Sequence, residues 1–136
     1  MNFAHHVIAE VVAHPGFDRL LFDMKHRPND LQIVGQQLLA VRGSPTAAVV
    51  RVPVHDMAWI KRVLDAGAPD VMVPNIRSVA EAREAVAWTR FPPEGLRGVA
   101  GSTRAGQAAS SPPTARPSRI STKARRWSAS EPTCTC

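Results

Sequence analysis

Apolar and polar residues follow two alternating patterns along residues 5–92. Short runs rich in apolar and β-branched residues, typical of buried strands, alternate with longer stretches in which apolar residues recur every three or four positions. The patterns predict strands at 19–23, 47–53 and 70–74, and helices within 5–14, 30–43, 56–67 and 78–92. Strands that alternate with helices in this way favour an α/β fold with a parallel sheet and right-handed crossovers.

Residues that commonly begin and end helices stand at the borders of these segments. Asp56 is placed to cap a helix N-terminus, and Ser78 with Glu81 three positions later forms a capping-box pattern. Gly43 and Gly67 follow the last apolar positions of their segments, where helices often end on glycine. The capping and helix-ending residues therefore agree with the helix boundaries that the spacing of apolar residues predicts.

The pattern stops after residue 105. Of residues 106–136, 19 are Ser, Thr, Pro or Ala, and only Ile120 and Trp127 are large apolar residues. Such a segment cannot bury a core, so we predict one domain over 1–105 and a disordered tail over 106–136. This composition is also what GC-rich DNA encodes in a shifted frame, and we favour an out-of-frame origin for the tail.

Positive charge is concentrated in that tail. The formal net charge is +6, yet residues 1–105 contain 12 Lys and Arg against 10 Asp and Glu, whereas residues 106–136 contain 5 against 1. The tail has no aromatic interleaving and no recognisable nucleic-acid-binding module, so we expect no nucleic-acid partner. A non-enzymatic basic binding protein stays open as an alternative.

Targeting and redox signals are sparse. No apolar stretch approaches the roughly 18 residues of a membrane span, and Glu10 interrupts the apolar start that a signal peptide needs. We therefore expect a cytoplasmic protein with no membrane partner. Cys134 and Cys136 are the only cysteines and have no second pair with which to build a zinc site.

Asp23 and His26 stand three residues apart where the first predicted strand ends. Loops at the carboxyl ends of parallel strands carry the active sites of α/β enzymes. A carboxylate and an imidazole at such a place suit acid–base chemistry. The alternative from spacing alone is a turn whose Asp caps the next helix and whose His is polar surface.

Motifs in a fixed order run through residues 16–105. They are Gly-Phe-Asp at 16–18, Leu-Leu-Phe-Asp at 20–23, His-x-Pro-Asn-Asp at 26–30, Val-Val-Arg-Val-Pro at 49–53, Ile-Lys-Arg-Val-Leu-Asp-Ala-Gly-Ala at 60–68, Val-Met-Val-Pro at 71–74 and Arg-Gly-Val at 97–99. In this order the chain resembles the HpcH/HpaI aldolase/citrate lyase family, and in particular its class II pyruvate aldolases. The resemblance implies a partial (β/α)8 TIM barrel of the phosphoenolpyruvate/pyruvate type, with about three strand–helix units.

The resemblance also implies a reaction and roles for four residues. Class II pyruvate aldolases are aldehyde-lyases that cleave 4-hydroxy-2-oxo acids into pyruvate and an aldehyde. His26 matches the base that accepts the 4-hydroxyl proton, and Asp65 matches the carboxylate that supports this imidazole. Arg51 matches the residue that steadies the enolate oxygen, and Asp23 lies close enough to orient water or metal.

A divalent metal such as Mg²⁺ or Mn²⁺ is the cofactor that the resemblance implies. In the family the metal holds the carboxylate and enol oxygen of pyruvate. The family's metal-binding Glu and Asp lie on later strands, and no residue of this chain matches them. Most of the first barrel strand is also missing, so we expect a truncated chain that is inactive as written. The family is usually homo-oligomeric, commonly hexameric.

The chain departs from the family pattern beside the predicted base. Lys25 stands where Glu is usual, and Arg27 stands where a small residue is usual. Val54 and His55 replace the common Trp-Asn, so we expect His55 to be a loop residue rather than a ligand. An alternative within the superfamily is a citrate lyase β-like enzyme that breaks a carbon–carbon bond in an acyl-CoA. The Asp-x-x-His loop favours the aldolase.

Overall fold

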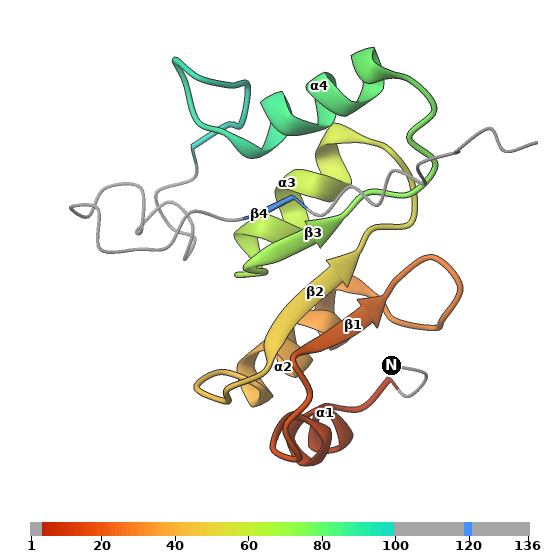
Figure 1. Ribbon diagram of the computed structural model, residues 1–136, viewed down its shortest axis with the longest axis vertical. Coiled ribbons are helices and arrows are strands. Elements are labelled where there is room, and N and C mark those ends of the chain that lie inside the picture. The colour runs from red at the N-terminus through yellow and green to blue at the C-terminus, as the bar shows by residue number, and fades with distance from the viewer. Residues whose placement is uncertain (1–3, 100–118, 121–136) are drawn as a thin grey trace, which may run out of the picture.

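Four parallel strands form a sheet with the order β1-β2-β3-β4 in this computed structural model, which describes residues 4–99 and 119–120 (Figure 1). The strands are β1 (Arg19–Asp23), β2 (Ala47–Arg51), β3 (Asp70–Met72) and β4 (Arg119–Ile120). Successive strands pair in parallel, and the arrowheads of β1, β2 and β3 point the same way in Figure 1. The predicted parallel α/β arrangement is therefore confirmed.

Two strands are shorter than predicted because prolines follow them. β2 ends two residues before Pro53, and β3 ends two residues before Pro74. Proline has no N–H to donate, so a strand ladder cannot run through it. A backbone hydrogen bond still extends the β2–β3 pairing past these strand ends, since the Val52 N–H donates to the Met72 carbonyl at 3.1 Å.

Among the described residues, one helix precedes the first strand and three further helices follow β1, β2 and β3, and each of the four begins and ends within its predicted segment. They are α1 (His6–Ala13), α2 (Leu31–Ala40), α3 (Met57–Asp65) and α4 (Val79–Thr89). α2 and α3 lie behind the strands in the view of Figure 1. None of the helices within residues 4–99 is long and apolar enough to cross a membrane.

The predicted caps are present. The Asp56 carboxylate accepts hydrogen bonds from two backbone N–H groups in the first turn of α3. The Ser78 hydroxyl accepts from the Glu81 N–H at 3.1 Å, and the Glu81 carboxylate accepts from the Arg77 N–H at 2.7 Å. Gly67, at φ 97°, follows α3 in the left-handed conformation that favours glycine. Local capping therefore sets the helix borders that orient the loops at the sheet edges.

Alternate strand residues and the inner faces of the helices form one hydrophobic core. The strand residues are buried apolar side chains that share a face of the sheet, and they meet apolar side chains of α2, α3 and α4. The main members are Leu20, Phe22, Ala48, Val50, Val71, Val34, Leu38, Ile60, Val63 and Ala85. Since side chains alternate along a strand, the intervening residues, which include Asp23 and Arg51, belong to the other face.

α1 presents its alanines to the core. Ala9 and Ala13 are fully buried, whereas Val7 and Val11, whose spacing predicts the helix, are 47% and 65% exposed. Small side chains let a helix approach its neighbour closely. The buried Thr46 hydroxyl donates to the Ala13 carbonyl at 2.7 Å, so the C-terminus of α1 is tied to the start of β2.

β4 is an addition to the predicted fold. Arg119–Ile120 pairs with β3 in parallel, in a segment where the sequence predicts no strand. The unpaired edge of β3 offers backbone donors and acceptors to any extended segment, whatever its side chains. The predicted domain border at residue 105 and the rest of the predicted disordered tail lie outside the described residues.

Candidate active site

Asp23 and Arg51 face each other at the carboxyl edge of the sheet. They are direct partners in the parallel register of β1 and β2. Arg51 Nε donates to Asp23 Oδ1 at 2.8 Å, and an Arg51 terminal nitrogen donates to Asp23 Oδ2 at 2.5 Å. The Asp23 side chain is 8% exposed and the Arg51 side chain 26% exposed. The structure thus brings two predicted site residues into one bidentate ion pair.

The ion pair determines the charge state of both groups. The hydrogen bond from Arg51 holds the pKa of the Asp23 carboxyl far below its usual range, although burial acts in the opposite direction. The same contact raises the pKa of the Arg51 guanidinium. Asp23 is therefore a permanent carboxylate in this structure and cannot act as a proton donor near neutral pH.

Asp23 also organises the loop that carries His26. Its Oδ1 accepts from the Lys25 N–H at 2.8 Å and more weakly from the His26 N–H at 3.4 Å. The buried Asn29 side chain donates to the Asp23 carbonyl at 3.0 Å and closes the other end of the loop. His26 is exposed, and its backbone N–H contacts the Asp23 carboxylate of the ion pair. An exposed imidazole on a backbone fixed by hydrogen bonds is accessible to a small-molecule hydroxyl.

Asp65 lies at the opposite edge of the sheet from His26 within this chain. It ends α3 just before β3 begins, and so belongs to the amino edge of the strands. Its carboxylate accepts from Lys61 Nζ at 2.7 Å and from Arg97 at 2.8 Å. Burial raises the Asp65 pKa, but these two cations outweigh burial and lower it overall. The structure therefore does not bring Asp65 to His26 within one chain, and its predicted role stays a prediction.

Arg97 is a buried cation that the sequence did not single out. Only 5% of its side chain is exposed, and its guanidinium lies 4.7 Å from the centroid of the Phe91 ring besides pairing with Asp65. The Arg97 N–H donates to the Arg90 carbonyl at 2.9 Å. These contacts attach the segment after α4 to the end of α3. A buried arginine cannot be told from an exposed one by sequence pattern alone.

The His55 side chain packs against Trp88 and does not point into the candidate site. Its ring centroid lies 4.8 Å from that of Trp88 on α4, with the ring planes tilted by 33°. Its Nε2 is buried and makes no hydrogen bond among the described residues. The contact places His55 between the loop after β2 and α4, as its expected place in a loop suggests.

The described residues do not fit a resident metal ion. Within residues 4–99, no group of three or more His, Cys, Asp or Glu side chains converges on one point. Asp23 is the carboxylate of the candidate site, and both of its oxygens accept hydrogen bonds from Arg51. Hard divalent ions need several free oxygen ligands at one place.

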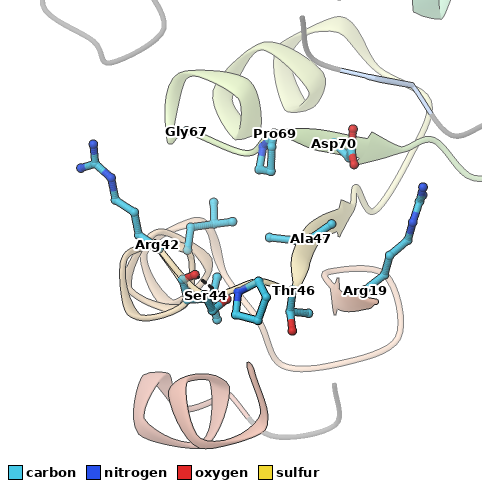
Figure 2. Close-up of a pocket in the computed structure, with 13 residues that line it drawn as sticks. Arg19, Arg42, Ser44, Thr46, Ala47, Gly67, Pro69 and Asp70 are labelled. Carbon is cyan, nitrogen blue, oxygen red and sulfur yellow. Dashed lines mark hydrogen bonds between the residues drawn. The ribbon is translucent and has the colours of Figure 1, made fainter. Parts of the chain in front are cut away.

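A pocket of about 440 Å³ lies at the amino edge of the sheet, away from this site (Figure 2). Its lining includes the residues at the starts of β2 and β3 and the turn after α2. Arg19 and Arg42 extend on opposite sides of the pocket, so their guanidinium groups do not converge on one point (Figure 2). The carboxyl edge, where Asp23, Arg51 and His26 gather, therefore remains the candidate for chemistry.

A parallel α/β fold with polar groups gathered at the carboxyl edge of its strands has the architecture of an α/β enzyme. The model of the HpcH/HpaI aldolase/citrate lyase family matches residues 1–111. The chain belongs to this family, which confirms the resemblance predicted from its motifs. The described residues form part of the aldolase fold, as the predicted partial barrel requires.

Curated relatives and a solved structure agree with this assignment. The chain is 48% identical over 99 residues to a 5-keto-4-deoxy-D-glucarate aldolase of Enterobacter sp. (strain 638), and 46% identical over 99 residues to one of Escherichia coli O139:H28. The crystal structure of a family protein from Burkholderia cenocepacia J2315 matches with a TM-score of 0.75 and 44% identity, over 79% of this chain and 44% of that one.

The matched segment is 73% of this chain but only 39% of the length of each of these two curated relatives. The activity of a whole relative is therefore a proposal where this chain is concerned.

Proposed function

We propose that the chain contributes the proton-transfer part of an aldolase that cleaves a 4-hydroxy-2-oxo acid into pyruvate and an aldehyde. The observation that carries the proposal is the Asp23–Arg51 pair beside the His26 loop, in a chain 48% identical to a named aldolase. The relatives named 5-keto-4-deoxy-D-glucarate aldolase support a sugar-acid substrate of this kind.

Three residues have distinct tasks in this proposal. His26 takes the proton of the 4-hydroxyl as the carbon–carbon bond breaks, and the electron pair of that bond passes to the pyruvate half as an enolate. Arg51 uses two N–H groups on Asp23 and keeps its remaining donors for the developing enolate oxygen. Asp23 holds Arg51 in place and stays ionised throughout.

The side chains of residues 4–99 do not fit the divalent metal of the family, because no three His, Cys, Asp or Glu side chains among them converge on one point. We propose that its ligands come from positions beyond the matched segment, and that the 136-residue chain alone is inactive for this reason.

The test compares the 136-residue chain with a hybrid in which residues 1–99 are joined to the remaining length of the Enterobacter relative. Release of pyruvate from a 4-hydroxy-2-oxo acid is followed with lactate dehydrogenase, with Mn²⁺ and then with EDTA. The proposal expects metal-dependent release by the hybrid and none by the chain alone. Release that persists in EDTA, or no release by a folded hybrid with Mn²⁺, would contradict it.

The acyl-CoA alternative has its own arm in the same assay. The family description includes citrate lyase, and an acyl-CoA carbon–carbon lyase would release acetyl-CoA from a suitable thioester. Turnover of the thioester without turnover of the hydroxy-oxo acid would favour that alternative.

The basic-binding alternative depends on residues 106–136, of which only Arg119–Ile120 is described, as strand β4.

A further inference from the structure

A hydrogen bond joins the two loops that flank the carboxyl end of β2. Lys25 Nζ donates to Asn75 Oδ1 at 3.0 Å, and these residues are 50 positions apart in the chain. Lys25 follows β1 and Asn75 follows β3, while β2 lies between those strands. We propose that this contact is a clasp across the end of β2, and that Lys25 and Asn75 are positioning residues for His26.

The sheet geometry explains why only long side chains can make the clasp. Strands two apart in a sheet are separated by roughly 9.5 Å, which backbone groups cannot bridge. The Met24 N–H still pairs with the Arg51 carbonyl at 3.0 Å, and the Val52 N–H with the Met72 carbonyl at 3.1 Å. The three segments that follow β1, β2 and β3 therefore leave the sheet side by side. The Lys25 side chain and the Asn75 side-chain amide together span the segment that follows β2.

The Asp23 carboxylate, two residues before Lys25, is already engaged by other donors. Asp23 accepts two hydrogen bonds from Arg51 and two from backbone N–H groups. None of the four ion pairs within the described part of the chain includes Lys25. Asn75 has φ 59°, a left-handed conformation that Asn tolerates better than most residues. The amide is therefore held on a fixed turn after the buried Pro74.

The clasp adds a side-chain contact to the backbone hydrogen bonds that Asp23 accepts from the loop. Asp23 fixes the backbone N–H groups of Lys25 and His26, and the clasp fixes the side chain of the residue directly before His26. His26, Arg27 and Pro28 are exposed, so few other contacts limit the loop.

The test is amide hydrogen exchange in the full 136-residue chain. The clasp proposal rests on the proposed function only for the role of His26, and the exchange test needs no catalytic turnover. Lys25→Met keeps the aliphatic stem and removes the ammonium, and it should speed exchange of the amides at 24–27 and 29 about three- to ten-fold, as expected for losing one hydrogen bond. Lys25→Arg keeps a donor and should preserve protection. Arg27→Met removes a neighbouring cation with no hydrogen bond among the described residues and should change nothing.

Rescue separates positioning from general stability. Asn75→Asp turns the acceptor into a carboxylate and should slow exchange at 24–27 and 29 in the parent chain, but not in the Lys25→Met background. The melting temperature should stay the same in both Lys25 variants. Equal effects of Lys25→Met and Arg27→Met, or slowing by Asn75→Asp without Lys25, would overturn the clasp. If the hybrid shows no turnover while the 136-residue chain gives the expected exchange rates, the proposed function is refuted and the clasp is supported.

Discussion

Asp23 and Arg51 are opposite partners in the register of β1 and β2, and Arg51 donates to both oxygens of the Asp23 carboxylate. Both side chains lie on the sheet face away from the helices, at the strand ends. A slip of one residue in the register would move either side chain to the helix-covered face. The ion pair therefore depends on the same pairing that builds the core.

Removing Arg51 should destabilise the fold. Arg51→Met leaves Asp23 as a carboxylate with an 8% exposed side chain and no side-chain cation. We expect a loss of about 2 kcal/mol of unfolding free energy, below the usual range for a buried pair because the Arg51 side chain is 26% exposed. Urea unfolding measures the change, and Arg83→Met on the exposed face of α4 is the control. A loss equal to that of the control would show that the pair adds no stability.

Acid should weaken the fold through Asp23 and Asp65. Both carboxyls have a folded pKa below their ordinary value of 3.8, so their contribution is fully present above that pH and is lost as pH falls below it. Asp23→Asn should lower the melting temperature at pH 7, and the gap from the parent should narrow between about pH 4 and pH 3. Thermal unfolding across pH 3–8 measures both chains. A difference in melting temperature between the parent and Asp23→Asn that stays constant over this range would contradict the lowered pKa of Asp23.

His26→Ala should abolish most of the proposed activity. In the hybrid with the relative's remaining length, we expect pyruvate release to slow by about two to four orders of magnitude, the usual worth of a general base. Arg27→Ala, at the next position in the exposed loop, should leave the rate within a few-fold. Less than a tenfold loss from His26→Ala would remove this residue from the mechanism.

Gly95→Ala should disturb the segment that Arg97 anchors. An added Cβ would lie 2.4 Å from the Ala87 carbonyl oxygen and 2.5 Å from the Arg90 carbonyl oxygen, and neither backbone atom can give way easily. We expect a loss of about 1–3 kcal/mol of unfolding free energy. Gly35→Ala in α2 has open space and should add about 0.5–1 kcal/mol of stability. Destabilisation of similar size by both changes would refute the packing argument.

The sequence predicts the order and type of the elements well because those depend on local forces. The capping residues Asp56 and Ser78 act within one helical turn, and the apolar strand at 19–23 needs only a periodic pattern to be recognised. Strand ends at Pro53 and Pro74 were placed two residues too far, although the missing N–H of proline was visible in the sequence. β4 was missed because backbone pairing at a free sheet edge needs no side-chain pattern.

The sequence places Asp23 at the end of the strand predicted at 19–23, His26 just after it, and Arg51 within the strand predicted at 47–53, so all three are expected near one edge of the sheet, and their chemical roles stay predictions. The contacts between these residues depend on the three-dimensional fold. Strand register joins Asp23 to Arg51, the direction of α3 carries Asp65 to the opposite edge, and sheet order lets Lys25 reach a residue 50 positions away. Such contacts arise from pairing between distant segments, which no local periodicity records.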